Sequence, residues 1–443
     1  MGVFIYMGVC MPNYNEIIYQ IYPLGFVGAP KENDGVTVNR IHKVIDWIPH
    51  FTKLSVTSIL FNPIFESGTH GYDTKDFDHI DCRLGTNDDF KEVSKQLHKN
   101  NIKVILDGVF NHVGREFSYF KDVLEKKWDS PYCEYFYIDF NNQDNPDGFT
   151  YVNWEGHSML VKLNLDNPKV RQYLIDKVDT WIKEYEIDGL RLDVAYTLNH
   201  TFMQELCAHV RESHPDFLFI GEMIHGDYNI LFNQGHLNSV TNYECYKGIY
   251  SSFNSKNLYE IAYSLNRQFG NEDWCLYRGK HLLSFLDNHD VNRIASNLED
   301  SSNLPLAYAL LFAMPGMPCI YYGSEWGATG MRTPESDAAL RPCFDEYTYN
   351  DLSKTITKLS QIRKDNPILA YGTYRQLSIQ NETLVFERVL DDKKVIFGIN
   401  MSQENKEMDI QGEYEALDLI DNKKVSLSHT IVLQPKSFCF YLV

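Results

Sequence analysis

The sequence has no long hydrophobic run and no closely spaced cysteine pairs. No apolar stretch reaches about 18 residues, the shortest helix that crosses a bilayer, so we expect no membrane span. The nine cysteines include no CxxC pair and are odd in number, which predicts free thiols in a reducing compartment. The first ten residues are apolar but contain no Lys or Arg, and no small-residue cleavage site follows. We therefore expect no secretory signal and a cytoplasmic protein.

Basic charge is also scarce. The chain has 60 acidic and 41 basic residues, for a formal net charge of −19 at pH 7. This balance argues against nucleic acid or an anionic membrane as a partner, because both attract basic surfaces. A neutral substrate would be unaffected by it, and the acidity mainly favours solubility.

Strand and helix signals alternate along most of the chain. Helical patterns cover residues 38–54, begin at Thr86 with Asp89 three residues later, and begin again at Pro168. Between such patterns lie eight short, nearly continuous apolar runs, as expected for parallel strands that are covered on both faces. They span 17–22, 56–62, 102–109, 188–195, 217–222, 237–242, 281–287 and 318–323. Eight repeats of this unit favour a (β/α)₈ TIM barrel over a doubly wound open sheet.

Two regions interrupt the alternation. Residues 113–165 are rich in Tyr, Phe, Asn and Asp and are far longer than one connection needs, which predicts an inserted subdomain after the third strand. After a helix at about 349–364, the chain turns to alternating runs with hairpin signals, as in 384–400. The predicted fold class is α/β. The predicted domains are a barrel at 1–112 and 166–366, an inserted subdomain at 113–165, and a C-terminal all-β sandwich at 367–443.

Four short stretches place charged groups where barrel strands end. They are DGVFNH (107–112), GLRLDVA (189–195), FIGE (219–222) and FLDNHD (285–290). A lone Asp at a strand end is more often a helix cap, but three carboxylates on one face repel each other and need a purpose. Active sites of such barrels lie at the ends of the strands, and a pair of carboxyl groups is what cleavage of a glycosidic bond requires. The predicted carboxylates are Asp193, Glu222 and Asp290.

These stretches, in this order and spacing, resemble the conserved segments of glycoside hydrolase family 13, the α-amylase family. IYQIYP (18–23) and GMPCIYYGSE (316–325) add two further matches. The resemblance implies that Asp193 is the nucleophile and that Glu222 is the general acid and base. It implies that Asp290 is a third carboxylate, which binds sugar hydroxyls and helps to distort the ring.

The resemblance also implies a set of substrate-binding residues. Arg191 would hold Asp193 ionised and oriented, since it points to the same side of its strand. His112 and His289 would donate hydrogen bonds to sugar hydroxyls, and Tyr72 in HGYD (70–73) would be the platform under that sugar. Asp107 would be structural, bracing Arg191 or nearby loops.

The chain departs from the family after the nucleophile. Many α-amylases have Lys-His at the positions of Tyr196 and Thr197, and the histidine's main chain helps to bind calcium. Asn111, another ligand of that site, is present and is the one candidate calcium ligand. We therefore predict that no cofactor is required.

Smaller matches narrow the substrate. DVAYT (193–197), KLN (162–164) and the stretch 327–344 resemble neopullulanases and cyclomaltodextrinases, although the amino-terminal carbohydrate-binding domain usual in that group is not matched. The expectation is an intracellular enzyme that cuts α-1,4 bonds of maltodextrins, an α-glucan oligosaccharide substrate, with retention. Cyclomaltodextrinase-like, α-1,6-specific and exo-acting specificities stay open, as does the oligomeric state.

Three other classes of protein compete with this interpretation. An inactive amylase-like binding protein would lack at least one of the three acids, and all three are present. A phosphate-using barrel enzyme would need basic residues after the last strands, and 316–327 has glycines but no Lys or Arg. A zinc enzyme using His112 and His289 lacks HxxxH or Cys/His spacing.

Overall fold

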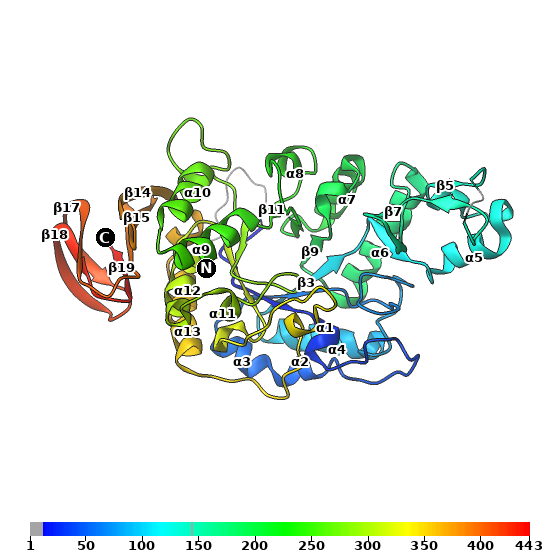
Figure 1. Cartoon of the computed structure of the whole chain (residues 1–443), viewed down its shortest axis with the longest axis horizontal. Helices are drawn as coiled ribbons and strands as arrows, with labels where there is room; N and C mark the ends of the chain where they lie inside the picture. Colours follow the sequence, from blue (N-terminus) through cyan, green and yellow to red (C-terminus); the bar gives the residue numbers. More distant parts are fainter. Residues whose placement is uncertain (1–11, 143–144) are drawn as a thin grey trace.

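A parallel eight-stranded barrel forms the centre of the molecule (Figure 1). The computed structural model describes residues 12–142 and 145–443; the apolar start assessed for a secretory signal lies outside them. The strand order is β11-β10-β9-β3-β2-β1-β13-β12, and a parallel bridge from Thr241 to Leu283 joins the two ends. The strands are β1 (Ile18–Ile21), β2 (Ser58–Phe61), β3 (Lys103–Gly108), β9 (Gly189–Leu192), β10 (Leu218–Gly221), β11 (Ser239–Val240), β12 (Leu283–Phe285) and β13 (Met317–Tyr321). Each lies inside or beside a predicted apolar run, so the predicted barrel is confirmed.

The barrel strands are buried on both faces, which explains their continuous hydrophobicity. Ile18 in β1 and Ile105 in β3 belong to a cluster that fills the barrel. Their neighbours Tyr19 and Val104 belong to the larger cluster between the strands and the helices. Successive side chains of one strand therefore enter two separate cores.

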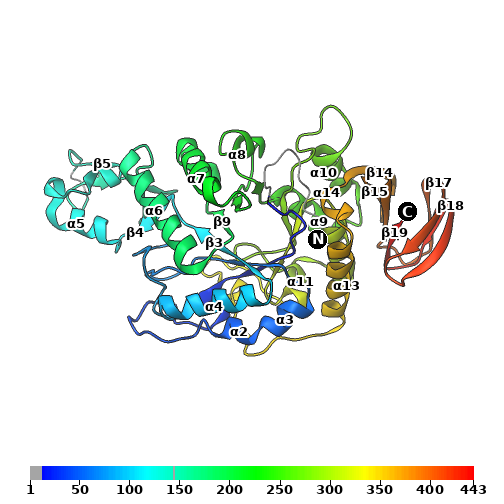
Figure 2. The same ribbon diagram turned by 180° about the vertical axis from the view of Figure 1, so that it is seen from behind.

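Helices surround the barrel, as the alternation predicts (Figures 1 and 2). They are α1 (Pro23–Phe26), α2 (Lys43–Asp46), α3 (Ile48–Lys53), α4 (Asn87–Lys99), α6 (Pro168–Tyr185), α7 (His200–Ser213), α8 (Asn229–Asn233), α9 (Tyr243–Ser255), α10 (Tyr259–Phe269), α11 (Ile294–Asn297), α12 (Leu304–Ala313), α13 (Asp351–Asp365) and α14 (Ile368–Tyr371). Two start signals are confirmed: Thr86 forms a reciprocal capping box with Asp89, and Pro168 is the first residue of α6.

The single helix predicted over 38–54 is wrong. The structure has α2 and α3 instead, and they meet at Trp47, where Pro49 lies in the first turn of α3 and lacks a backbone N–H. The start of the segment is extended, because the N–H groups of Val38 and Arg40 donate to the carbonyls of Cys82 and Leu84 at 3.0 and 2.8 Å. Apolar residues at helical spacing are buried here by a loop and two short helices.

The region after β3 forms a small layer of its own, which lies at one end of the molecule in Figure 1. It contains α5 (Ser118–Lys126), the three-stranded antiparallel sheet β4 (His112–Gly114), β8 (His157–Lys162) and β7 (Asn153–Trp154), and the pair β5 (Ile138–Asp139) and β6 (Thr150–Tyr151). Because β4 begins at His112, this sheet starts directly at the barrel mouth. The insertion is therefore positioned to contribute side chains to a site there.

The C-terminal region is all-β, as predicted. We expected a sandwich of two sheets, but all six strands are hydrogen-bonded into one antiparallel sheet, in the order β14-β15-β16-β19-β17-β18. Its strands are β14 (Thr373–Gln380), β15 (Thr383–Leu390), β16 (Lys393–Asn400), β17 (Lys406–Asp418), β18 (Lys423–Leu433) and β19 (Ser437–Leu442). The sheet curls over its own core, so that Ser378 Oγ in β14 donates to the carbonyl of Asp409 in β17 at 2.8 Å.

Two sequence expectations concern the whole chain. The eight cysteines at described positions are all free, as expected; four are buried and Cys343 is exposed. Within residues 12–142 and 145–443, no helix has the length and apolar character needed to cross a membrane.

Candidate active site

The ends of three neighbouring strands bring four charged side chains together. Asp107 is in β3, Arg191 is in β9, Asp193 follows β9 and Glu222 follows β10. Asp107 and Ile220 both lie opposite Arg191 in the sheet register, so Arg191 stands between two strands that carry acids. All four side chains are nearly inaccessible to solvent. The three positions predicted from this part of the sequence, Arg191, Asp193 and Glu222, therefore meet at one point.

The guanidinium of Arg191 is the centre of this group. Its Nη1 donates to Asp193 Oδ1 at 2.8 Å and to Asp107 Oδ1 and Oδ2 at 2.8 and 2.9 Å. Its Nη2 forms an ion pair with Glu222 Oε1 at 2.5 Å. One positive charge thus serves three carboxyl groups, and the charge-assisted contact expected between Arg191 and Asp193 is present.

Asp107 has the fullest set of donors of the three acids. Besides Arg191, Asp107 Oδ2 accepts from Asn62 Nδ2 at 3.1 Å and from the Tyr72 hydroxyl at 3.0 Å. Asn62 also donates to the Tyr72 hydroxyl at 3.1 Å. These bonds fix the carboxyl group of Asp107 against Arg191, in keeping with the bracing role expected for Asp107.

Burial shapes the protonation of all three acids, and it raises the pKa of Asp107 against the opposing effect of Arg191, Asn62 and Tyr72. It raises the pKa of Asp193 well above the ordinary value against the opposing effect of Arg191, and the negative charges of Glu222 and Asp107 raise it further. Burial likewise raises the pKa of Glu222, and Arg191 opposes that shift. Since one cation cannot neutralise three carboxylates, a proton shared by Asp193 and Glu222 is favoured, and the two titrate as a pair.

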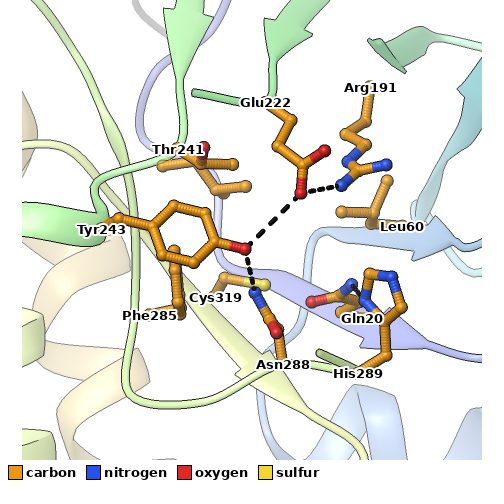
Figure 3. Close-up of a pocket in the computed structure, with 11 residues that line it drawn as sticks. Gln20, Leu60, Arg191, Glu222, Thr241, Tyr243, Phe285, Asn288, His289 and Cys319 are labelled. Carbon is orange, nitrogen blue, oxygen red and sulfur yellow. Dashed lines mark hydrogen bonds and ion pairs between the residues drawn. The ribbon is translucent and has the colours of Figure 1, made fainter. Parts of the chain in front are cut away.

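Backbone and side-chain donors hold Glu222 in place. The N–H of Val194 donates to Glu222 Oε2 at 2.9 Å. Val194 has a left-handed backbone conformation, with φ 40° and ψ 45°, which costs energy for a β-branched residue. This turn directly after Asp193 aims the amide at Glu222. The Tyr243 hydroxyl, which accepts from Asn288 Nδ2 at 3.1 Å, lies 3.5 Å from Glu222 Oε1 (Figure 3).

Figure 3 shows that Glu222, Arg191 and His289 line one pocket over the barrel interior. His289 is buried, and burial lowers its pKa to about 3, so the ring is neutral near pH 7. Gln20 Nε2 lies 3.1 Å from Nδ1 and donates to it, which assigns the ring proton to Nε2. Nε2 in turn lies 2.5 Å from the Tyr72 hydroxyl and 3.0 Å from Asp290 Oδ2.

The third predicted carboxylate lies at the rim of the pocket. Asp290 Oδ1 accepts from Arg341 Nη2 at 3.1 Å, and Arg341 Nε also donates to the carbonyl of His289 at 3.0 Å. Burial alone would raise the pKa of Asp290, but the neighbouring His289, Arg341 and Arg191 lower it below the ordinary value. Asp290 is therefore an anion beside a protonated pair, as a group that binds sugar hydroxyls would be.

His112 is the seventh and last of the predicted catalytic and substrate-binding residues. Burial lowers its pKa to about 3, and Asn111 Nδ2 lies 3.1 Å from Nδ1, which assigns the ring proton to Nε2. That Nε2 is buried and has no hydrogen-bond partner among the described residues. Trp154 from the insertion lies beside it, with ring centroids 5.8 Å apart, and its indole Nε1 is also buried without a partner. Two unpaired donors at one position are suited to a ligand with hydroxyl groups.

The candidate calcium ligand has other partners. Asn111 Oδ1 accepts a hydrogen bond from the Thr197 hydroxyl at 3.1 Å, and the same hydroxyl lies 2.8 Å from the carbonyl of Val194. Within the described residues, the only cluster of three acidic, His or Cys side chains that could hold a metal is elsewhere, at Glu66, Asp81 and Cys82. A calcium site needs several oxygen ligands, among them carboxylates. The neighbour of Asn111 Oδ1 is instead the hydroxyl of Thr197, so these surroundings fit calcium poorly.

Sequence reasoning missed several residues of this site. Gln20 and Asn62 are polar side chains at the ends of apolar strands, and that contrast is a signal that could have found them. Tyr243, Trp154 and Arg341 follow elements far away in sequence and have no distinguishing pattern.

Comparisons with known proteins agree with this geometry. A model of the α-amylase catalytic domain matches residues 20–366. A maltogenic α-amylase of Bacillus acidopullulyticus is 30% identical over 422 residues, 89% of this chain and 70% of that protein. A cyclomaltodextrinase from a Bacillus species is 30% identical over 396 residues, 83% of this chain and 69% of that protein.

Solved structures with the same fold cover almost the whole chain. A cyclomaltodextrinase superposes with a TM-score of 0.85 at 27% identity, covering 97% of this chain and 78% of that one. A cyclic α-maltosyl-(1→6)-maltose hydrolase from Arthrobacter globiformis gives a TM-score of 0.82 at 26% identity, covering 97% and 99%. With the family model matched across the barrel and the acids gathered at its mouth, the chain belongs to the α-amylase family of glycoside hydrolases, glycoside hydrolase family 13.

Proposed function

We propose that this enzyme hydrolyses α-1,4-glucosidic bonds of linear and cyclic maltodextrins with retention of configuration. The observation that carries the proposal is the sharing of one guanidinium by Asp193 and Glu222, through Nη1 and Nη2 of Arg191. Retaining enzymes need their two carboxyl groups about 5–5.5 Å apart, closer than the 6.5–9.5 Å of inverting enzymes. Two acids bonded to one planar cation favour the closer arrangement.

The two acids take different parts in the reaction. Asp193 is bonded to Arg191 through Oδ1, and its other oxygen attacks the anomeric carbon, forming a glycosyl ester as the glycosidic C–O bond breaks. Glu222 gives its proton to the departing oxygen. Glu222 then takes a proton from water, whose oxygen attacks the anomeric carbon and releases Asp193. Burial raises the pKa of Glu222, as a proton donor requires, but it raises that of Asp193 as well, so the division of roles between the two acids rests on the family resemblance.

The remaining residues hold the sugar in this proposal. The unpaired Nε2–H of His112 donates to a sugar hydroxyl, and the Asp290 carboxylate accepts from others. The Nε2–H of His289 exchanges its contacts with the Tyr72 hydroxyl and Asp290 for a hydroxyl of the sugar. Tyr72 stacks on His289, with ring centroids 5.6 Å apart and planes 7° apart, and forms the adjoining wall. No step of this proposed reaction uses a metal ion, and the need for calcium stays a prediction for the EGTA experiment.

A second specificity has an observation of its own. The hydrolase from Arthrobacter globiformis was solved in complex with cyclic α-maltosyl-(1→6)-maltose, and that structure covers 98% of this chain and 100% of its own, with a TM-score of 0.83. The test therefore includes cyclic and branched substrates with α-1,6 bonds as well as substrates with α-1,4 bonds. It also detects exo-action, the release of products from chain ends.

Product analysis by chromatography decides between these specificities. Maltooligosaccharides, cyclodextrin, pullulan, panose and cyclic α-maltosyl-(1→6)-maltose are incubated side by side with the enzyme and with Glu222→Gln as control. Rapid opening of cyclodextrin supports the proposal. Release of glucose alone from chain ends, or cleavage only of substrates that contain α-1,6 bonds, contradicts it.

A further inference from the structure

An unusual group of aromatic rings lies on the outer side of α10. Tyr259 and Tyr263 are 48% and 64% exposed, and Trp274, in the loop after this helix, is 52% exposed. Tyr259 and Tyr263 are four residues apart on one helix, so their side chains lie on the same face about 6 Å apart. Tyr263 and Trp274 are stacked, with ring centroids 6.5 Å apart and planes 21° apart. The three residues, here called the α10 ladder, lie on this helix and the loop that follows it.

The ladder ends at a groove between the barrel and the C-terminal sheet. The groove is lined by Tyr259, Gln380, Asn381, Glu382, Thr383 and Lys406, and it shares no residue with the pocket of Figure 3. In both views of the molecule α10 lies beside β14 (Figures 1 and 2). The two elements are joined by a hydrogen bond from Asn266 Nδ2 to Gln376 Oε1 at 2.7 Å, and Leu258 N–H donates to Asn381 O at 2.7 Å. The groove is therefore built on firmly connected elements.

One buried polar atom in the groove lining is unsatisfied. Thr383 is completely buried, and its hydroxyl has no hydrogen-bond partner among the described residues. A buried hydroxyl without a partner costs roughly 1–3 kcal/mol. Because Thr383 is part of the groove lining, a water or a ligand hydroxyl that reaches this atom would remove that cost. This is an observation independent of the exposed rings.

The chemistry of the patch selects the ligand. Glu260, Glu272, Asp273 and Glu382 lie on or beside it, whereas Arg267 and Lys406 are paired with Glu244 and Glu404, so an anionic ligand would be repelled. Charged groups so close to the rings also differ from the core of a protein interface, which is depleted of charge. Flat exposed rings beside amide and hydroxyl groups suit the apolar faces and hydroxyl groups of a neutral sugar chain.

We propose that the α10 ladder and the groove at Tyr259 form a second carbohydrate-binding site, which holds the chain of an α-glucan away from the catalytic pocket. The identity of the sugar rests on the proposed function. Such a site raises the local concentration of long substrates without contributing to the cleavage of short ones.

The test uses the full chain with Glu222→Gln, so that the glucan is not consumed. Migration is measured in native gels with and without soluble starch, for this protein and for the same protein carrying Tyr263→Ala and Trp274→Ala. Trp128→Ala is the matched control, because Trp128 is 69% exposed and lies on the insertion. We expect the double change to weaken the affinity for starch at least fivefold, and the control to leave it within twofold. Equal retardation of all proteins would overturn the proposal.

Two further measurements separate this result from other causes. The melting temperatures of the double variant and of its parent are compared. A difference of less than about 2 °C shows that the fold is kept, so that weaker binding is not due to unfolding. Light scattering after gel filtration measures whether the protein is a dimer. If the double variant is monomeric where its parent is a dimer, and starch retards both equally in the native gel, the ladder is a protein interface and the proposal is overturned. With Glu222 restored, cleavage of maltotriose should be the same with and without the ladder. Failure to cleave any glucan would refute the proposed function, whereas weakened starch binding would still support the site.

Discussion

Replacing Asp193 with Asn should stabilise the fold at neutral and alkaline pH. Asp193, Asp107 and Glu222 share the single positive charge of Arg191 in a buried site. The wild-type protein must therefore either keep excess negative charge out of water or bind a proton that the unfolded chain would release. Asn is nearly the same shape, and its side-chain oxygen can still accept the 2.8 Å hydrogen bond from Arg191 Nη1.

The direction of the effect follows from the pKa of Asp193. That pKa is raised well above the usual Asp value of about 3.9, first by burial and then by the other acids. Each tenfold change in the ionisation equilibrium corresponds to about 1.4 kcal/mol. We expect Asp193→Asn to add about 1–3 kcal/mol to the free energy of unfolding above the folded-state pKa. Because a raised folded pKa makes stability fall as pH rises, the gain should vanish below about pH 4.

Asp107→Asn is the matched control. Burial raises the pKa of Asp107 as well, but the opposite sign is expected because its two oxygens accept more hydrogen bonds than those of Asp193. Asp107 Oδ2 accepts from Arg191, Asn62 and Tyr72, and Oδ1 accepts from Arg191 again. An amide NH₂ would place a donor against donors on either side, which costs about 1–3 kcal/mol for each group left unpaired.

Thermal unfolding of the three proteins, followed by intrinsic fluorescence from pH 4 to pH 9, measures both effects. The reasoning predicts melting temperatures in the order Asp193→Asn, wild type, Asp107→Asn at pH 8. It also predicts that the first two proteins converge at pH 4. A lower melting temperature for Asp193→Asn at pH 8 would refute the claim that the acids compete for one cation.

Three further changes test other parts of the account. Glu222→Gln removes the proton donor and should lower turnover of maltotriose by about a hundred- to ten-thousand-fold in steady-state assays; a tenth of the wild-type rate would contradict its role. Thr86→Ala removes the acceptor for Asp89 N–H at the start of α4 and should lower the free energy of unfolding in urea by about 1 kcal/mol, whereas no change would show that the cap is unimportant. EGTA should leave the melting temperature unchanged, because Asn111 Oδ1 is bonded to Thr197; a lower melting temperature would establish a structural calcium ion.

Parts of the fold could be predicted because single residues dictate them locally. Thr86 with Asp89, and Pro168, fix helix starts by satisfying or omitting the first N–H groups. The eight apolar runs are long enough to be strands and too short for buried helices. The prediction of one helix over residues 38–54 was wrong although their apolar residues do recur at helical spacing. Pro49 and the contacts with residues 82–84 divide the segment into an extended start and two short helices, which bury the same apolar residues.

The site shows the same division. Asp193, Glu222 and Asp290 could be predicted because acids that follow apolar strands must meet at one rim of a barrel. The groups that tune these acids come from distant loops and from the insertion. Arg341 and Trp154 reach the site only through tertiary packing, so no local pattern marks them.

The central claim is that Asp193 forms a covalent bond to the sugar and that Glu222 is the base that activates water to release the sugar from Asp193. The most direct measurement incubates Glu222→Gln with α-maltosyl fluoride, whose fluoride leaves without an acid, and then maps the digested protein by mass spectrometry. The account predicts that one maltosyl group accumulates on the peptide that contains Asp193, because the base for its release is missing. A maltosyl group on any other residue, or turnover to the inverted anomer without an adduct, would contradict it.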